Sequence, residues 1–491
     1  MEIHLLYKEK NFTDEDRVED YMEDVSEDLE LDYLYEVMSG EDKNIRTMVK
    51  KVLLSPLNDE QDIYRRQEII KDCLKNKEKI HRLYDFLGQV LDRNEENNGL
   101  YMSSPTGKFE NAVQTVKKYH KDLYRLREIA EEYDQYFTSE GFKELWMNIR
   151  TELDEEFLSE SGKLLSELEF RDGMLVEMQL DGRNQTKGYR LLRKNNKKID
   201  LKWKLSPGYS LLSNDMAGVK DLYSRKDRAT VQCVSVLENA SKFIEKYFLI
   251  FYRELGFYMG IVHLAEILDD LGVRYVFPNI VDDQKYRSFA DLKNIILILK
   301  NHSCVGNTLN LTGKKLILIT GANQGGKTKL LQSIGQAQLM MQSGIFVMAQ
   351  EYNSHLCEGI YTHFKREEDQ ELKSGKLDEE LRRLNRLIPH LKSGSLILFN
   401  ESFSSTNEME GSQLCLQISA ALKESGIEQI HVTHLYDFAR KCECREDGEI
   451  LFLKADRRED GSRTYRIEEG LPEKSAYGRD IYEKVWKDIK I

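Results

Sequence analysis

A glycine-rich stretch in the C-terminal half of the chain has the composition of a phosphate-binding loop. It reads Gly321-x-x-x-x-Gly326-Lys327-Thr328, follows the apolar run LILIT and leads into a stretch with helical spacing. Glycines let backbone N–H groups curl around phosphate oxygens, and the positive end of the following helix adds to the attraction. Lys327 would neutralise the β- and γ-phosphates, while the Thr328 hydroxyl would hold Mg²⁺. The stretch therefore predicts a site for ATP and Mg²⁺, with a chance glycine-rich turn as the alternative.

A second apolar run, SLILF, ends at Asn400-Glu401. Phosphate-binding ATPases usually carry Asp-Glu at this place, where the Asp accepts hydrogen bonds from waters on Mg²⁺ and the Glu polarises the attacking water. Asn400 keeps a carbonyl acceptor but lacks the negative charge, so we expect weaker Mg²⁺ binding. Glu401 is the predicted catalytic residue, and hydrolysis stays possible. A surface acid at a strand end is the alternative interpretation of Glu401.

A third apolar run, QIHVTH, ends at His434. A histidine at the end of a strand can contact the γ-phosphate or the attacking water. A structural histidine is the alternative, and the other two motifs in the same segment favour the catalytic interpretation.

The elements that would position these residues follow from the spacing of apolar residues. Short apolar runs, KKLILIT, GIFVMA, SLILFN and QIHVTH, alternate with helical stretches from about residue 300 onward. This alternation predicts an α/β domain over 300–491 with a largely parallel sheet.

The preceding part of the chain is predicted to be helical. Apolar residues recur at three- and four-residue spacing over much of 31–299, and this pattern is interrupted at about 173–205 by alternation with turn signals. We therefore expect a helical domain with a small β tip. Residues 1–30 form an acidic N-terminal segment, for which we expect a solvated helix face or tail, with a partner-binding arm as the alternative.

The predicted β tip is strongly basic. Residues 183–204 hold nine Lys or Arg and one acid, a local charge of +8 in a chain whose net charge is -13. A solvated face is the usual meaning of such a run, but its concentration at one tip favours contact with nucleic-acid phosphates. The predicted DNA-binding residues are Arg183, Lys187, Arg190, Arg193, Lys194, Lys197, Lys198, Lys202 and Lys204.

The cysteines and the apolar runs of the sequence indicate a cellular compartment. The seven cysteines are scattered, and the sequence shows neither a secretory leader nor an apolar run of about eighteen residues. We expect a cytoplasmic protein with reduced thiols and no membrane contact.

The C-terminal motifs resemble those of the MutS family, the DNA mismatch-repair clamps within the ABC-type ATPase class. TGANQGGKT is similar to the family's T-G-P-N-M-G-G-K-S and keeps Asn323 and Gly325. NESFSSTNEMEG aligns with D-E-I-G-R-G-T-S-T-x-D-G, keeping Glu401 but lacking the Gly-Arg-Gly. Upstream, VLLSPLNDEQDIYRRQEII is similar to the start of the family's core domain, so the likeness covers roughly 30–491.

This resemblance implies a C-terminal P-loop ATPase domain of the ABC type, preceded by an all-α core or lever domain with a β clamp-like tip. It implies a homodimer through the ATPase domain. Ser374 in SGKLDEE would then offer its hydroxyl to the partner's γ-phosphate, as in the family's S-T-F-M-x-E-M signature. The implied nucleotide contacts are Gly321, Asn323, Gly325, Gly326, Lys327, Thr328 and Ser374.

Two functions remain open from the sequence. The first is an ATP-driven clamp that binds structured or duplex DNA and hydrolyses ATP slowly. The alternative is a nucleotide-gated scaffold or dimerisation switch with little or no hydrolysis, which the replacement at Asn400 and the missing Gly-Arg-Gly favour. Only some thirty residues precede the core segment, and the Phe-x-Glu triplets match the family's mismatch wedge by letters alone, so recognition of mismatches through such a wedge is not expected.

Overall fold

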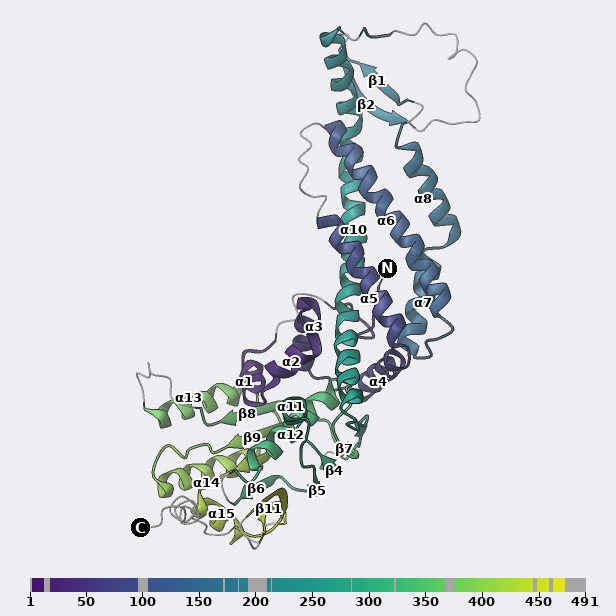
Figure 1. Ribbon diagram of the computed structural model, residues 1–491. Helices are drawn as coiled ribbons and strands as arrows, with labels where there is room; N and C mark the ends of the chain where they lie inside the picture. The colour runs from purple at the N-terminus through teal and green to yellow at the C-terminus, as the bar shows by residue number, and fades with distance from the viewer. Residues whose placement is uncertain are drawn as a thin grey trace, which may run out of the picture. The chain divides into compact units, whose positions relative to one another are not determined.

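The computed structural model divides into two compact units (Figure 1). Unit 1 comprises Met1–Phe12 and Asn76–Leu255, and unit 2 comprises Thr13–Lys75 and Gly256–Ile491. The described residues are 2–12, 18–95, 105–170, 173–183, 185–192, 210–212, 214–283, 285–321, 324–366, 375–444, 448–458 and 462–472. The sequence predicts domain boundaries at residues 30 and 300 on functional grounds, whereas the two units are defined by packing. The predicted boundaries stay a prediction.

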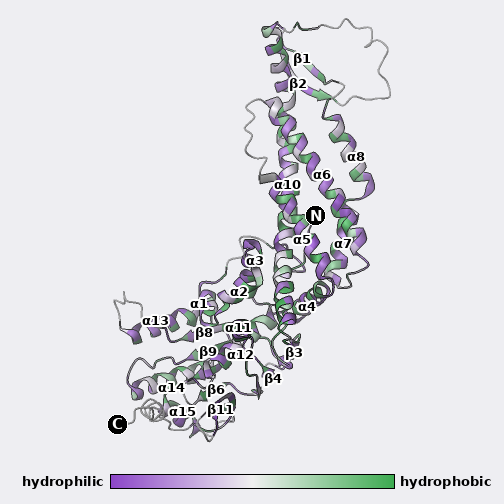
Figure 2. Ribbon diagram, in the orientation of Figure 1, coloured by the Kyte–Doolittle hydropathy of each residue, from purple (hydrophilic) through white to green (hydrophobic). Residues whose placement is uncertain are grey.

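Unit 1 is a helical body with a small hairpin. Its helices alternate hydrophilic and hydrophobic residues (Figure 2), which is the pattern that buries one stripe of each helix. Phe137, Phe142 and Trp146 pack together in one part of its core, with the Phe142 and Trp146 rings stacked and the Phe137 ring edge-on to Trp146. Its helices are α5 (Lys77–Glu95), α6 (Pro105–Tyr133), α7 (Glu140–Glu152), α8 (Glu155–Glu167) and α10 (Met216–Asp270), which continues past Leu255 into unit 2.

An antiparallel hairpin lies within the predicted β tip. It pairs β1 (Leu175–Leu180) with β2 (Thr186–Leu192), and the register shifts between Glu177 and Gln179. The turn at Asp181-Gly182 is the one that the sequence predicts, whereas the predicted turn at 195–196 lies outside the described residues.

Unit 2 contains two sheets. The larger has the order β12-β11-β6-β10-β9-β8, and all of its neighbours are parallel except the pair β11 and β12. Its strands are β6 (Leu316–Thr320), β8 (Ile360–Phe364), β9 (Leu396–Asn400), β10 (Glu428–Val432), β11 (Ile450–Arg457) and β12 (Arg463–Glu469). The smaller has the order β3-β7-β4-β5, formed by β3 (Asn279–Ile280), β4 (Arg287–Leu292), β5 (Asn307–Asn310) and β7 (Glu351–Ser354).

Helices surround these sheets. They are α1 (Asp20–Asp28), α2 (Leu31–Ser39), α3 (Lys43–Leu53), α4 (Glu60–Lys75), α11 (Ile295–Asn301), α12 (Lys327–Gln342), α13 (Lys376–Leu387), α14 (Glu408–Glu424) and α15 (Tyr436–Glu443). The prediction of a helical N-terminal region followed by an α/β region is confirmed. The larger sheet is largely parallel, as the sequence predicts, with one antiparallel pair at β11 and β12, whereas the smaller sheet is mixed. The predicted strand GIFVMA was wrong: these residues are buried, yet they form only an isolated bridge through Val347.

The acidic N-terminal stretch is folded rather than a free tail where the structure describes it. Helix α1 buries Met22 and Val25 and packs against β8, while Glu23 stays exposed. The carboxylates of Asp24 and Glu27 pair with Arg366, the latter at 2.9 Å. The expectation of a solvated face therefore holds for one side of this helix, because its other side covers the edge of the large sheet.

One described helix is long and apolar enough to cross a membrane by length and composition. It is α10, and 72% of its most apolar window is buried within the folded chain. Such burial is what a core helix shows.

Candidate nucleotide-binding site

The three predicted motifs lie at the same edge of the large sheet. Strand β10 runs parallel to both β6 and β9, and Val432 is in register with Ile319 on one side and with Asn400 on the other. The carboxyl ends of parallel strands form the edge where open α/β sheets bind ligands. The glycine-rich loop after β6, Glu401 after β9 and His434 after β10 therefore project from neighbouring strand ends.

The glycine-rich loop needs glycine at two positions because of its backbone. Gly321 has φ +111°, and a Cβ there would lie 3.1 Å from the backbone N of Ala455. Gly326 has φ +92° and immediately precedes α12. The first N–H groups of a helix have no partner within the helix, and they carry the positive end of its dipole. The loop and the start of α12 thus offer donors to an anion.

Lys327 is held inside this loop. Its side chain is buried, and its Nζ donates to the carbonyl oxygen of Gly321 at 2.8 Å. Burial lowers the pKa of Lys327 to about 8, against the opposing influence of the Glu401 carboxylate. An anion bound beside the ammonium group would favour the charged form, so the site is electrostatically suited to phosphate.

Thr328 and Asn400 form a direct contact between the loop and the end of β9. The Thr328 hydroxyl donates to Oδ1 of Asn400 at 3.0 Å. Hydroxyl and amide oxygens are hard ligands of the kind that Mg²⁺ prefers, and Mg²⁺ commonly keeps several waters in its shell. The donor set fits a magnesium ion held by the Thr328 oxygen, with Asn400 accepting hydrogen bonds beside it.

Glu401 and His434 are paired across the end of the sheet. Nε2 of His434 lies 3.1 Å from Oε1 of Glu401, and both side chains are about one-third exposed. The hydrogen bond from His434 is the main influence that lowers the pKa of Glu401, and Lys327 contributes in the same direction. The Glu401 carboxylate is consequently held in its ionised form near the Lys327 ammonium group.

Residues that sequence reasoning missed hold the turn that follows Glu401. The Phe403 N–H donates to Oε2 of Glu380 on α13 at 2.6 Å. Nδ1 of His363 in β8 lies 2.7 Å from the Ser402 hydroxyl oxygen. Both partners lie far from the turn along the chain, and no spacing rule signals the contacts. His363 is a polar residue within the apolar strand β8, which was the available signal for it, whereas α13 is rich in charged residues and nothing in its sequence distinguishes Glu380.

An arginine of β12 is a further missed contact of the loop. One Nη of Arg463 donates to Oε1 of Gln324 at 2.5 Å, and the Arg463 charge also depresses the pKa of Lys327. Gln324 has φ +59°, so its side-chain bond to β12 helps to fix a left-handed residue in the loop.

Several predicted site residues lie outside the described part of the chain. They include Asn323 of the loop and Ser374, the predicted contact with a partner subunit. Of the basic tip, Arg183, Lys187 and Arg190 are described, and all three are exposed on or beside the hairpin. The remaining predicted DNA contacts, Arg193, Lys194, Lys197, Lys198, Lys202 and Lys204, lie outside the described residues.

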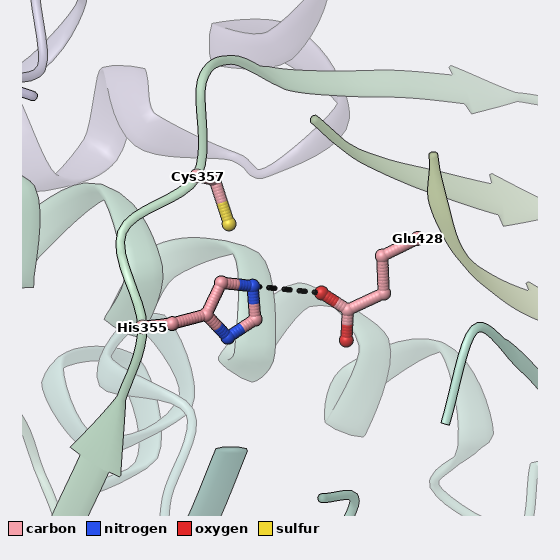
Figure 3. Close-up of side chains that lie close together, drawn as sticks. All are labelled: His355, Cys357 and Glu428. Carbon is pink, nitrogen blue, oxygen red and sulfur yellow. Dashed lines mark ion pairs between the residues drawn. The ribbon is translucent and has the colours of Figure 1, made fainter. Parts of the chain in front are cut away.

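A second polar cluster lies within unit 2 (Figure 3). His355, Cys357 and Glu428 bring one potential metal-ligand atom each to within 4.8 Å of one another. Arg287, however, donates to both Glu428 oxygens, at 3.2 and 2.8 Å, and lies 3.4 Å from the Cys357 sulfur. A guanidinium group among the ligand atoms repels a cation, so this cluster is better described as a buried ion-pair network.

Two family models match the chain. Residues 58–271 match the model described as the MutS2 N-terminal domain, and residues 317–485 match the model described as MutS domain V.

Curated relatives match over a shorter segment. An Endonuclease MutS2 from Thermus thermophilus is 33% identical over 172 residues, which are 35% of this chain and 23% of that protein. An Endonuclease MutS2 from Streptococcus uberis is 29% identical over 192 residues, covering 37% of this chain and 24% of that protein. MutS protein homolog 4 from Homo sapiens is 26% identical over 179 residues, covering 35% and 19% respectively. The matched segment thus spans no more than a quarter of these relatives' length. With both family models matched along its length, the chain belongs to the MutS family.

Proposed function

We propose that this protein binds ATP, hydrolyses it slowly and uses the nucleotide cycle to control binding to structured or duplex DNA. The observation that carries the proposal is the meeting of Lys327, Thr328, Glu401 and His434 at one edge of the large sheet. This set supplies an ammonium group for phosphate, an oxygen for Mg²⁺ and a carboxylate for water. Membership of the MutS family supports the same assignment.

In this proposal each side chain has a separate task. The glycine-rich loop and Lys327 bind the phosphates, and Thr328 holds Mg²⁺, which neutralises phosphate charge when bound. Glu401, kept ionised by His434, orients and polarises the attacking water. Asn400 accepts hydrogen bonds where an Asp would add a negative charge, so weaker Mg²⁺ binding makes hydrolysis slow.

The proposed DNA contact is the basic hairpin region. Arg183, Lys187 and Arg190 are exposed there, and phosphate contacts by Lys and Arg make affinity fall steeply with salt. We propose a homodimer through the ATPase segment, 300–491, with Ser374 reaching the partner's nucleotide. Replacing Lys194, Lys197 and Lys198 by Glu should abolish binding to duplex DNA, and unchanged affinity would contradict the proposed contact. Lys163→Glu, an exposed change on α8, is the matched control.

The alternative is a nucleotide-gated scaffold with little or no hydrolysis. The observation that favours it is the polar Thr328–Asn400 contact, which lacks the negative charge that would hold Mg²⁺ firmly. In that case ATP would act as a structural ligand that favours one conformation of the chain.

ATP turnover by the purified protein with Mg²⁺ separates these functions. We expect slow turnover that disappears in Glu401→Gln, rises in Asn400→Asp and is stimulated by branched or plain duplex DNA. Glu408→Gln, at an exposed acid of α14, should leave turnover unchanged. Tight ATP binding without turnover in every preparation would contradict the proposed hydrolysis and support the scaffold.

A further inference from the structure

A buried carboxylate lies beneath the turn that carries Glu401. Glu380 of α13 is 7% exposed, and its Oε2 accepts the Phe403 N–H at 2.6 Å. Burial raises the pKa of Glu380, while the hydrogen bond from Phe403 acts in the opposite direction. A buried carboxyl group is retained at little cost only when it is hydrogen-bonded, and here the bond goes to the catalytic turn.

The turn itself depends on its surroundings. Glu401 has φ +54° and Phe403 has φ +60°, and neither residue is glycine. Left-handed backbone is disfavoured for residues with a Cβ, so it persists only where neighbouring groups fix it. On the sheet side the Glu401 N–H donates to the Val432 carbonyl oxygen at 2.8 Å. On the opposite side the contact with Glu380 fixes the position of Phe403.

Helix α13 is tied to β8 by the same group of residues. Nε2 of His363 lies 3.0 Å from the Glu380 carbonyl oxygen, and Arg383 donates to the Phe364 carbonyl oxygen at 2.8 Å. The Ser402 hydroxyl donates to the His363 carbonyl oxygen at 2.6 Å. The turn, β8 and α13 therefore form one continuous polar network in which Glu380 contributes both its carboxylate and its backbone carbonyl.

We propose that Glu380 is a positioning residue for Glu401, and that α13 controls the catalytic turn through it. The proposal rests on the proposed ATP hydrolysis. Glu380 acts through the backbone: it accepts the Phe403 N–H and so fixes the direction in which Glu401 leaves β9. A displacement of α13, which begins two residues after Ser374, would release the turn and move the Glu401 carboxylate from its place beside His434.

The test compares Glu380→Ala with Glu380→Gln, which keeps an oxygen acceptor for Phe403. Asp378→Ala is the matched control, because Asp378 is exposed on the same helix and pairs only with Arg382 among the ion pairs of the described residues. Turnover is measured at a temperature where every variant is folded. We expect Glu380→Ala to lower kcat by ~10–100-fold with KM for ATP unchanged, because small misplacements of a catalytic group have effects of this size. Glu380→Gln should recover most of the loss.

Amide hydrogen exchange at Phe403 tests the positioning separately from hydrolysis. We expect its protection to be lost in Glu380→Ala and kept in the Gln and Asp378 variants, even if the wild-type protein shows no turnover and the proposed function fails. If Glu380→Ala does not fold, Glu380→Gln still decides: loss of Phe403 protection in a folded Gln variant overturns the role of the oxygen acceptor. Unchanged kcat and unchanged protection in folded Glu380→Ala would overturn the proposal as a whole.

Discussion

Two turns at the same edge of the large sheet reach left-handed backbone in different ways. The loop after β6 places glycines at two of its left-handed positions, with φ +111° at Gly321 and +92° at Gly326. The turn after β9 has Glu401 and Phe403 at +54° and +60° without any glycine. Glycine adopts such angles without a steric penalty, whereas the other turn relies on side chains from α13 and β8.

This difference separates local from tertiary causes. Apart from Gln324, which Arg463 helps to fix, the glycine-rich loop carries its conformation in its own residues, so a change at one of its glycines acts directly on that loop. A side-chain-held turn takes its conformation from distant elements, so it can respond to their movement and to their protonation. The binding of phosphate is therefore expected to be robust, while the placing of Glu401 is expected to be adjustable.

The largest expected effect comes from breaking the glycine-made loop. Gly321→Ala introduces a Cβ 3.1 Å from the Ala455 backbone N at a φ that alanine rarely adopts. We expect ATP affinity to fall by ~100-fold or more, because strain and loop displacement of a few kcal/mol convert to that factor. Titration of a fluorescent ATP analogue measures the change.

Gly313→Ala is the matched control for this prediction. Gly313 has φ +76°, but a Cβ there would meet no atom within 4 Å. It should cost ~1 kcal/mol of stability through backbone strain alone and leave ATP affinity unchanged. Equal losses of affinity in both variants would mean that the Ala455 contact does not shape the loop.

The same difference explains what the sequence could predict. The glycine-rich loop could be predicted because its residues and its flanking strand are contiguous in the sequence. The ends of β9 and β10 could be predicted because each motif follows an apolar run. The roles of Glu380 and His363 could not be predicted, since these residues contact the turn from other elements of the fold. The segment at Val347 was misassigned because a buried apolar run satisfies strand and non-strand packing equally well.

The second prediction concerns the turn after β9 and the protonation of His363, which contacts that turn. His363 is buried between Ser402 and the Glu380 carbonyl, and burial lowers its pKa from 6.5 to about 4. A depressed histidine pKa means that the unfolded chain takes up the proton first as pH falls. The stabilisation is therefore present above pH 6.5 and is lost progressively down to about pH 4.

Urea unfolding at a series of pH values measures this contribution. Between pH 6.5 and 4 we expect the wild type to lose ~2–3 kcal/mol more of its unfolding free energy than His363→Gln, which cannot titrate. The Gln variant controls for the carboxylates that also titrate in this range. Parallel stability curves for the two proteins would show that His363 does not hold the turn in its neutral form.

The smallest of the three effects concerns the far side of the same turn. His434→Ala removes the hydrogen bond that is the main cause of the lowered Glu401 pKa, so that pKa should move back toward its usual range. The turn stays held by Glu380 and β8, so we expect kcat for ATP to fall only ~10-fold, the loss of one orienting contact. The pH–rate profile supplies the sharper measurement: its acidic limb should move to higher pH in His434→Ala. If the rate falls but the acidic limb does not shift, His434 contacts the substrate rather than maintaining the charge of Glu401. The contacts with α13 and β8 would then be sufficient to hold the turn that carries Glu401.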